Sequence, residues 1–329
     1  MESFHVRDIP RYDAHHRIIC TFYPHPFSGM LNDSKAIVKA TGLIVLSSCA
    51  FGSLSTLTVL ITRSGLPLLP AMLWRYLIAA GFLFVILWKQ QQLIISRKDA
   101  LRLMLTGGLA QSTITFLSLH ALNYLPVGPL AFLFYTYPAW VALISAILGR
   151  EDLTLSRIIA LTIAMTGIVV MVGLPSSGSL NRFGVLLALG TALLYALYLP
   201  TLHRVQEGIP AAVSSFYLIA GVFIAFFLAS VTVGEVQMPT TLSLWGFVIV
   251  LAIWSTVIAF ASLVAGLRVL GPVRTSIVAT IEPFFTALLG SLLLGETITR
   301  NTVLGGILIA FAVLILQVTA RETAMPEPA

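Results

Sequence analysis

Long apolar runs, separated by short polar segments, dominate the pattern of hydrophobic and polar positions along this chain. Ten runs approach the length of about 20 mainly apolar residues that a helix needs to cross a bilayer. They lie near residues 37–60, 70–88, 101–122, 128–148, 157–173, 183–203, 211–233, 243–265, 273–294 and 302–319. The connections are short and rich in Pro and Gly, which predicts one helical bundle with no soluble domain attached.

The composition supports a membrane protein and excludes several other classes. The chain is 58% hydrophobic and 10% charged, with a mean hydropathy of +0.97, whereas a soluble domain carries about 25% charged residues. The bases behind the net charge of +6 are not clustered on an aromatic-rich face, so nucleic acid is not a predicted partner. Cys20 and Cys49 offer neither a disulfide framework nor a metal-ligand spacing. With no nucleotide-binding loop or zinc-protease motif either, the sequence predicts no enzyme, no metal and no cofactor.

The distribution of Lys and Arg predicts the orientation, because short cytoplasmic loops carry an excess of these residues. With the N-terminus in the cytoplasm, fifteen bases fall in inside segments and three, Arg63, Arg182 and Arg300, in outside segments. Ten helices then leave both termini in the cytoplasm. Residues 1–34 are polar and lack the apolar core of a signal peptide. They are predicted to be a disordered tail, with Met30 as an alternative start, and residues 321–329 form a second tail.

Two stretches 145 positions apart repeat one pattern. Residues 137–151 (YPAWVALISAILGRE) and 282–296 (EPFFTALLGSLLLGE) each open on a residue followed by Pro and reach a Gly shortly before a final Glu. The offset predicts two five-helix repeats, at residues 35–178 and 179–320. Because five is odd, the second repeat must cross the membrane in the opposite direction. Inverted repeats recur in secondary transporters, so this pattern favours transport by alternating access.

Several short motifs agree with that architecture. They are Trp74-Arg75-Tyr76, Tyr124-Leu-Pro-Val-Gly-Pro, Pro138 with Leu148-Gly149-Arg150-Glu151, and Glu282-Pro283 with Leu294-Gly295-Glu296. On these motifs the chain resembles the EamA family of the drug/metabolite transporter superfamily, over about residues 37 to 319. The resemblance implies an all-α membrane protein with ten transmembrane helices in two inverted five-helix repeats. It also implies a bacterial inner-membrane location and the efflux of amino acids or related small metabolites, or drugs.

Two formal charges, Arg75 and Glu282, are predicted to lie well inside helices. A charge near the bilayer centre is costly, so each suggests a function. Glu282 is placed about 14 Å into its helix, at 1.5 Å per residue. Its carboxylate either carries a proton or contacts a substrate amine, or it bonds a backbone amide near the Pro283 break. Arg75 either snorkels or pairs structurally, or it holds a carboxylate substrate or Glu282 itself.

The other candidates for substrate binding are polar or aromatic residues that share a helix face or lie mid-helix: Tyr195, Tyr198, Tyr137, Trp140, Trp254, Ser255 and Gln111. Each has an alternative role in packing or at the membrane interface. Together with the repeats, these residues predict a secondary exporter of a small molecule, with protons as the candidate coupling ion.

Two alternative functions stay open. One is a gradient-driven exchanger or facilitator of a phosphorylated or nucleotide-linked solute, which would need several bases converging on a cavity. The other is a membrane enzyme or a scaffold that transports nothing. The predicted partners are the small-molecule substrate and the lipid bilayer, and the chain is expected to be a monomer or a weak homodimer.

Overall fold

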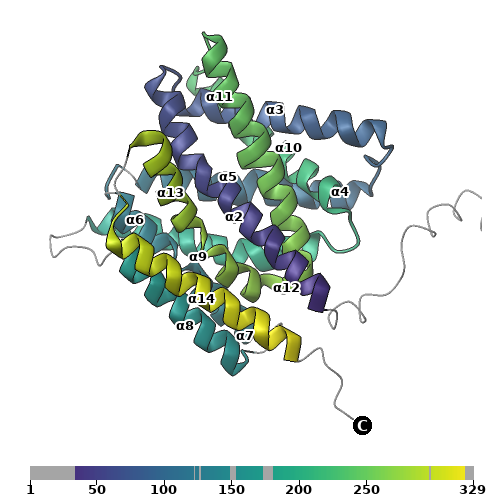
Figure 1. The fold of residues 1–329 in the computed structure, drawn as a ribbon. Coiled ribbons are helices and arrows are strands. Elements are labelled where there is room, and N and C mark those ends of the chain that lie inside the picture. Colours follow the sequence, from purple (N-terminus) through teal and green to yellow (C-terminus); the bar gives the residue numbers. More distant parts are fainter. Residues whose placement is uncertain are drawn as a thin grey trace, which may run out of the picture.

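The computed structural model describes residues 34–121, 123–125, 127–148, 153–172, 181–295 and 298–322, and within them all the regular secondary structure is helical (Figure 1). The two predicted tails fall almost entirely outside these ranges, and so does the predicted boundary between the repeats near residue 178.

The helices follow the predicted apolar runs, with ends that differ by a few residues. In chain order the elements are α2 (Ser34–Arg63), α3 (Leu68–Lys89), α4 (Arg97–Leu105), η3 (Thr106–Gln111), α5 (Ser112–Ala121), α6 (Val127–Phe134), α7 (Tyr137–Ile147), α8 (Leu155–Val172), α9 (Arg182–Val205), α10 (Ala211–Val233), α11 (Leu242–Ala252), η4 (Ile253–Ile258), α12 (Ala259–Ala279), α13 (Glu282–Leu294) and α14 (Arg300–Glu322).

Five helices of the described chain are long and apolar enough to cross a membrane by themselves. They are Lys35–Arg63, Leu68–Lys89, Arg182–Val205, Ala211–Val233 and Leu242–Ala279. The remaining apolar helices are shorter: Tyr137–Ile147, Leu155–Val170, Glu282–Leu294 and Arg300–Leu316. The ten predicted runs are therefore not reproduced as ten uninterrupted helices, and the interruptions have local causes.

Two of the interruptions are π-helical segments. Helices α4 and α5 continue into each other through η3, and α11 continues into α12 through η4. The two π segments start close to the 145-residue offset between the repeated stretches, at Thr106 and Ile253. Each inserts an extra residue into the helical ladder and so changes which side chains face a neighbour, a feature frequently found at functional sites.

Two further interruptions are breaks that precede a proline. Helix α6 ends at Phe134 and α7 begins at Tyr137, while α12 ends at Ala279 and α13 begins at Glu282. In each case Pro is the second residue of the new helix, at Pro138 and at Pro283. Proline has no N–H to donate to the carbonyl four residues earlier, so the helix ends before it.

These breaks correct one predicted helix. Residues 273–294 were expected to form one helix that starts after Gly271. A kink at Gly271, with φ 73° and ψ 170°, does separate two helices within α12, but the second of them ends at Ala279 and α13 begins at Glu282. Only glycine adopts this conformation readily, because a Cβ would clash with the backbone. Glu282 thus opens a helix instead of lying nine residues inside one.

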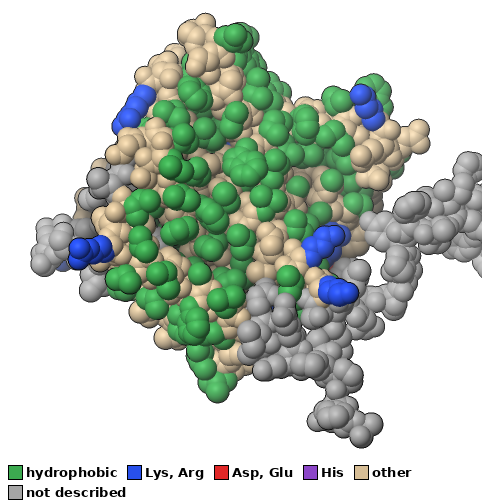
Figure 2. All heavy atoms as spheres, in the orientation of Figure 1, with side chains coloured by type: hydrophobic (Ala, Val, Ile, Leu, Met, Phe, Trp, Pro, Cys, Tyr) green, Lys and Arg blue, Asp and Glu red, His purple; other side chains and the backbone are tan. Residues whose placement is uncertain are grey.

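The helices cross at varied angles, and the outermost pair, α8 and α14, lies side by side (Figure 1). Helix α2 packs along α12 and α13, and α3 packs against α10. Hydrophobic residues form a large buried cluster around α9 and α12, and a second one between α2, α3, α10 and α11. Figure 2 shows that the outer surface is also mostly hydrophobic on the face drawn, with Lys and Arg near its edges. That exterior suits a bilayer as solvent.

Candidate functional site

The break between α12 and α13 places Glu282 at the first position of α13. Around the break the backbone closes shorter turns, in which the N–H of Thr280 bonds the carbonyl of Ile277 at 3.2 Å and the Thr280 hydroxyl bonds the same oxygen at 2.6 Å. Helix α2 approaches closely here, because a Cβ at Gly52 would lie 3.0 Å from the Glu282 carbonyl oxygen. The Glu282 backbone therefore lies against α2, at the junction between α12 and α13.

The equivalent break in the first repeat contributes a group of tyrosines. Tyr135 lies in the break and Tyr137 opens α7, and both face α9, where Tyr195 and Tyr198 lie one turn apart. The ring centroids of Tyr137 and Tyr195 are 4.7 Å apart at 78°, and those of Tyr195 and Tyr198 are 5.8 Å apart. We call Tyr135, Tyr137, Tyr195 and Tyr198 the tyrosine cluster; Phe134 packs against it, 5.6 Å from Tyr195.

Glu282 belongs with this cluster. It interacts electrostatically with the phenols of Tyr135, Tyr137 and Tyr195. Tyr137 and Tyr198 are 1% and 2% exposed, whereas Glu282 and Tyr195 keep part of their surface accessible. The structure thus brings together four of the nine predicted residues, which come from three helices, α7, α9 and α13, in two repeats.

The hydrogen bonds around Glu282 bear on its two interpretations. Within the described part of the chain, no backbone amide donates to the Glu282 carboxylate; its backbone carbonyl accepts from the Thr286 hydroxyl at 3.2 Å. The Tyr198 hydroxyl is buried and has no partner among the described groups. A carboxylate beside several phenols can accept hydrogen bonds from an ammonium group or can bind a proton. The faces of the aromatic rings attract cations as well.

Arg75 lies in a separate group, at the crossing of α3 with η4. It is 1% exposed, and its Nε donates to the Thr256 hydroxyl at 2.6 Å while its Nη2 donates to the Ser255 carbonyl at 3.0 Å. Its guanidinium also lies 4.7 Å from the centre of the Tyr76 ring. Arg75 is therefore bonded to the π segment rather than to Glu282.

The Arg75 group extends to α2. The hydroxyls of Ser53 and Ser255 are 2.7 Å apart, so η4 is hydrogen-bonded by two helices of the first repeat. The Thr256 hydroxyl donates to the Leu251 carbonyl, five residues earlier, as the π geometry requires. We call Arg75, Ser53, Ser255 and Thr256 the Arg75 cluster.

The three remaining candidates have different surroundings. Trp140 is 37% exposed on α7, although Tyr137 one turn earlier is buried. Trp254 is half-buried on η4 beside Ser255, and Gln111 is half-buried at the end of η3. No ring contact or side-chain hydrogen bond among the described residues joins these three to the tyrosine cluster.

The sequence missed Tyr135, Thr256 and Ser53 as members of these groups. Tyr135 precedes the Thr-Tyr-Pro sequence and occupies the place that Thr280 has in the second repeat, a correspondence that the 145-residue offset could have revealed.

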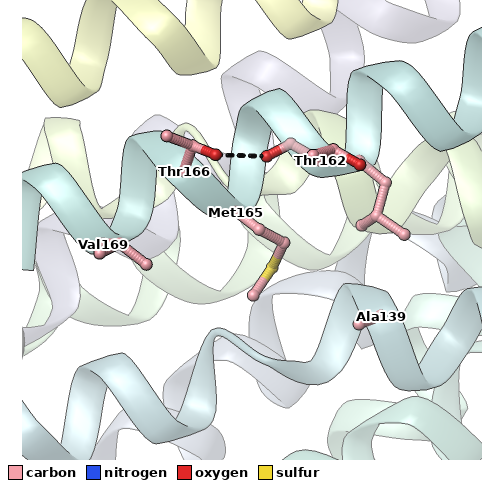
Figure 3. A pocket seen from close by; sticks show the side chains of 6 residues that line it. Ala139, Thr162, Met165, Thr166 and Val169 are labelled. Carbon is pink, nitrogen blue, oxygen red and sulfur yellow. Dashed lines mark hydrogen bonds between the residues drawn. The ribbon is translucent and has the colours of Figure 1, made fainter.

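A hollow of about 440 Å³ between α7 and α8 lies apart from these groups. It is lined by Ala139, Leu161, Thr162, Met165, Thr166 and Val169. In Figure 3 the Thr166 hydroxyl is bonded to the Thr162 carbonyl, at 2.8 Å, so its proton is used within α8. The hollow contains none of the nine predicted residues. The described chain also holds no group of three or more His, Cys, Asp and Glu side chains that could bind a metal.

Comparisons with known proteins agree with this architecture. Two relatives from Archaeoglobus fulgidus, both named uncharacterized transporters, are 26% and 25% identical over 198 and 186 residues. The alignments cover 59% and 55% of this chain, and they span 68% and 63% of the relatives. A protein of known crystal structure has a TM-score of 0.72 and 18% identity, covering 86% of this chain and 98% of its own; at that identity it shows the fold alone.

The strongest comparison is with a family model described as the EamA-like transporter family. It matches twice, over residues 39–173 and 182–318, which confirms the two-repeat architecture. The two matches together cover most of the 329 residues. The chain is therefore a membrane protein that belongs to the EamA-like transporter family.

Proposed function

We propose that this protein is a secondary transporter that exports small molecules carrying a protonated amine, with amino acids and related compounds as the leading class and amine drugs as further cargo. The observation that carries the proposal is the pairing of Glu282 with the tyrosine cluster at two helix breaks. We further infer a bacterial inner-membrane location, with both termini in the cytoplasm.

The proposal includes ten membrane spans. Each π-containing helix counts as one span, and each broken helix forms one span together with the helix that precedes its break. The kink at Gly271 then separates the eighth span from the ninth. Broken helices in corresponding positions of two halves are a common way to build a binding site near the middle of the membrane, because the break frees backbone groups and side chains there.

The chemistry of the site favours a cation. Glu282 is the acidic member and the tyrosines supply aromatic faces and phenolic oxygens, all of which attract an ammonium group. Glu282 and Tyr195 each keep part of their surface accessible, as contact with a ligand requires. Tyr135 and Tyr137 come from the first repeat, whereas Glu282, Tyr195 and Tyr198 come from the second. Relative movement of the repeats would therefore change how closely the site holds the ligand.

The proposed cycle exchanges a proton for the amine. With the site open to the cytoplasm, the Glu282 carboxyl releases its proton and the ammonium group of the substrate takes its place. The repeats then move so that the site opens outward, where a proton binds the carboxylate and the amine leaves. A proton gradient directed inward would drive this exchange toward export, because the same carboxylate holds either the proton or the amine, but not both.

The phosphorylated-solute exchanger is less favoured by the same geometry. That function needs several bases at the substrate site, and the one base predicted there, Arg75, is buried and already donates to Thr256 and Ser255.

The test is untargeted mass spectrometry of the medium from cells that overproduce the native protein, Glu282→Gln, Glu235→Gln or nothing. Glu235 is an exposed acid that follows α10, so its variant controls for the loss of one carboxylate. We expect amine compounds to accumulate outside with the native protein and Glu235→Gln, and at least tenfold less with Glu282→Gln. Size-exclusion profiles of the purified variants must match, to show that folding is unchanged.

Two outcomes would contradict the proposal. Equal accumulation with Glu282→Gln would remove Glu282 from the mechanism, although transport would stand. If the compounds that accumulate lack an amine, the substrate class is wrong.

A further inference from the structure

A second hollow, of about 420 Å³, lies between α4 and the C-terminal end of α9. It is lined by Arg102 of α4 and by Thr201, Arg204 and Val205 of α9. Arg102 and Arg204 are just over a hundred positions apart in the sequence and belong to different repeats. The fold therefore brings two guanidinium groups to one hollow, and none of the predicted transport residues takes part in it.

We propose that this hollow binds the phosphate headgroup of an anionic phospholipid, with the acyl chains lying along the exposed faces of α4, η3 and α9. In the orientation inferred from the basic loops, the hollow lies at the cytoplasmic surface of the membrane. Basic pockets between transmembrane helices on that side are suited to anionic headgroups.

The charges around the hollow support an anionic ligand. Arg102 and Arg204 are both exposed, as is Lys98, which lies one turn from Arg102. The Arg102 Nη1 lies 3.8 Å from an Asp99 carboxylate oxygen, with the two side chains 68% and 38% exposed. Ion pairs that exposed are weak, so Asp99 does not neutralise the hollow.

The end of α9 adds a second acid and another base. Glu207 is exposed just beyond α9, and His203 lies in its last turn. The Thr201 hydroxyl donates to the Leu197 carbonyl at 2.7 Å, so toward a ligand it has only its oxygen lone pairs to offer. Binding of an anion must therefore come from the arginines.

The neighbouring helix faces indicate why the anion would be a lipid. On α9, Leu197 and Leu193 lie two and three turns from Arg204 and are 46% and 43% exposed. On the other helix, Leu105 follows Arg102 by three positions in α4 and Leu109 lies further on, in η3; the two are 47% and 64% exposed. Residues three, four or seven positions apart share one helix face. Each arginine therefore stands at the end of an apolar stripe, which matches a charged headgroup above two acyl chains.

A lipid held in this way would join α4 to α9, and so the first repeat to the second. Helix α9 also carries Tyr195 and Tyr198, and α4 leads into η3. The proposal needs only a membrane-embedded chain with this end in the cytoplasm; it does not depend on Glu282 or on transport.

The test uses the purified full-length protein in neutral detergent, with native mass spectrometry to measure bound dioleoyl phosphatidylglycerol. Dioleoyl phosphatidylcholine and sn-glycerol 3-phosphate serve as zwitterionic and chain-free probes. Arg102→Gln with Arg204→Gln is compared with Arg63→Gln with Arg182→Gln, which removes two exposed arginines at the opposite membrane surface. Unchanged melting without lipid would show that both double variants fold.

We expect the Arg102/Arg204 double variant to bind phosphatidylglycerol at least tenfold more weakly, because each base near an anionic surface contributes about fivefold. The Arg63/Arg182 control should change less than twofold, and phosphatidylcholine binding should respond to neither. Equal phosphatidylglycerol binding by both double variants would overturn the proposal. Competition by sn-glycerol 3-phosphate at the same concentration would also overturn it, in favour of a site for small phosphates.

Discussion

The two helix breaks have similar backbones and different side chains. In the first repeat, Thr136 precedes α7 with φ −72° and ψ −13°, and in the second, Ile281 precedes α13 with φ −73° and ψ −15°. The first break is followed by Tyr137, which is 1% exposed among aromatic rings, and the second by Glu282, which is partly accessible. The repeats thus share the device that interrupts the helix, and they differ in the chemistry placed there.

The two π segments show the same contrast. Segment η3 packs directly onto α10, since a Cβ at Gly107 would lie 2.1 Å from the Leu218 carbonyl oxygen. Segment η4 is instead reached by a long side chain, that of Arg75, from α3. Helix α10 and η3 are in contact because glycine leaves their backbones free to approach, whereas α3 and η4 are joined by the hydrogen bonds of a buried arginine.

Helices α3 and α10, which make these two crossings, share a short identical sequence. The sequence Tyr-Leu-Ile-Ala occurs at residues 76–79 in α3 and at 217–220 in α10, followed by Ala80 in one case and Gly221 in the other. The extra methyl of Ala80 is tolerated in the first repeat, whereas the place of Gly221 leaves no room for one. The repeats therefore share a sequence here but not a helix spacing, because α10 approaches its neighbour too closely for a methyl group at position 221.

The largest expected effect comes from giving the α10 crossing the residue found in α3. In Gly221→Ala the new Cβ would lie 2.1 Å from the Met104 carbonyl oxygen and 2.9 Å from the Gly108 nitrogen. Backbone atoms cannot rotate away, so we expect the two helices to separate, at a cost of more than about 3 kcal/mol. Fluorescence-detected size exclusion should show loss of the monodisperse peak.

Gly81→Ala is the matched control for this variant, because nothing lies within 4 Å of a Cβ there. It should leave the peak intact and stabilise the helix by up to about 1 kcal/mol. A normal profile for Gly221→Ala would mean that α10 does not contact η3 as closely as the structure has it.

The sequence predicted where the helices and the repeated stretches lie better than it predicted which side chains contact one another there. Apolar runs located the helices, and the 145-residue offset related Tyr137 to Glu282. Helical spacing placed Tyr195 and Tyr198 on one face correctly, because α9 is uninterrupted there. Trp140 lies three positions after Tyr137 in α7 but is 37% exposed, and among the described residues it has no ring contact with the tyrosine cluster, so its place in the site stays a prediction.

The π segments could not be predicted, because their extra residue is specified by tertiary contacts rather than by a local motif. Arg75 shows the consequence. The sequence placed Arg75 inside a helix, with snorkelling and pairing both open, but its partners Thr256 and Ser255 lie in η4, where α-helical spacing does not hold. Tyr135 was missed for a related reason, since a residue inside a break has no place on a helical face.

The second expected effect is the loss of the charge at the η4 crossing. Arg75→Ala removes two hydrogen bonds from a charged donor and leaves a cavity, so we expect the free energy of unfolding to fall by about 3 kcal/mol. Arg75→Lys should recover less than half of this, because one ammonium cannot replace the forked guanidinium. Thermal melting of the purified protein in detergent measures both variants.

Arg63→Ala controls for the loss of a positive charge, because Arg63 is exposed at the end of α2. Its melting should match the native protein. If Arg75→Ala also melts normally, then the buried bonds to η4 do not hold the crossing together, and Arg75 becomes available again as a substrate-binding candidate.

The smallest expected effect concerns the second bond to η4. The Ser53 hydroxyl lies 2.7 Å from both the Ala50 carbonyl oxygen and the Ser255 hydroxyl, and it has one proton to donate. If that proton goes to Ala50, as it does for many helical serines, Ser53 is the acceptor for Ser255 and the two residues are coupled across the repeats. Ser53→Ala should then lower the free energy of unfolding by about 1 kcal/mol, and exposed Ser55→Ala should leave it almost unchanged.

A double-mutant cycle of Ser53→Ala with Ser255→Ala tests this coupling, because a coupling energy of about 0.5 kcal/mol or more requires that the pair interact. Strict additivity would leave Arg75 as the side chain that bonds η4 from the first repeat within the described chain, and the polar contrast between the two crossings would rest on that one residue.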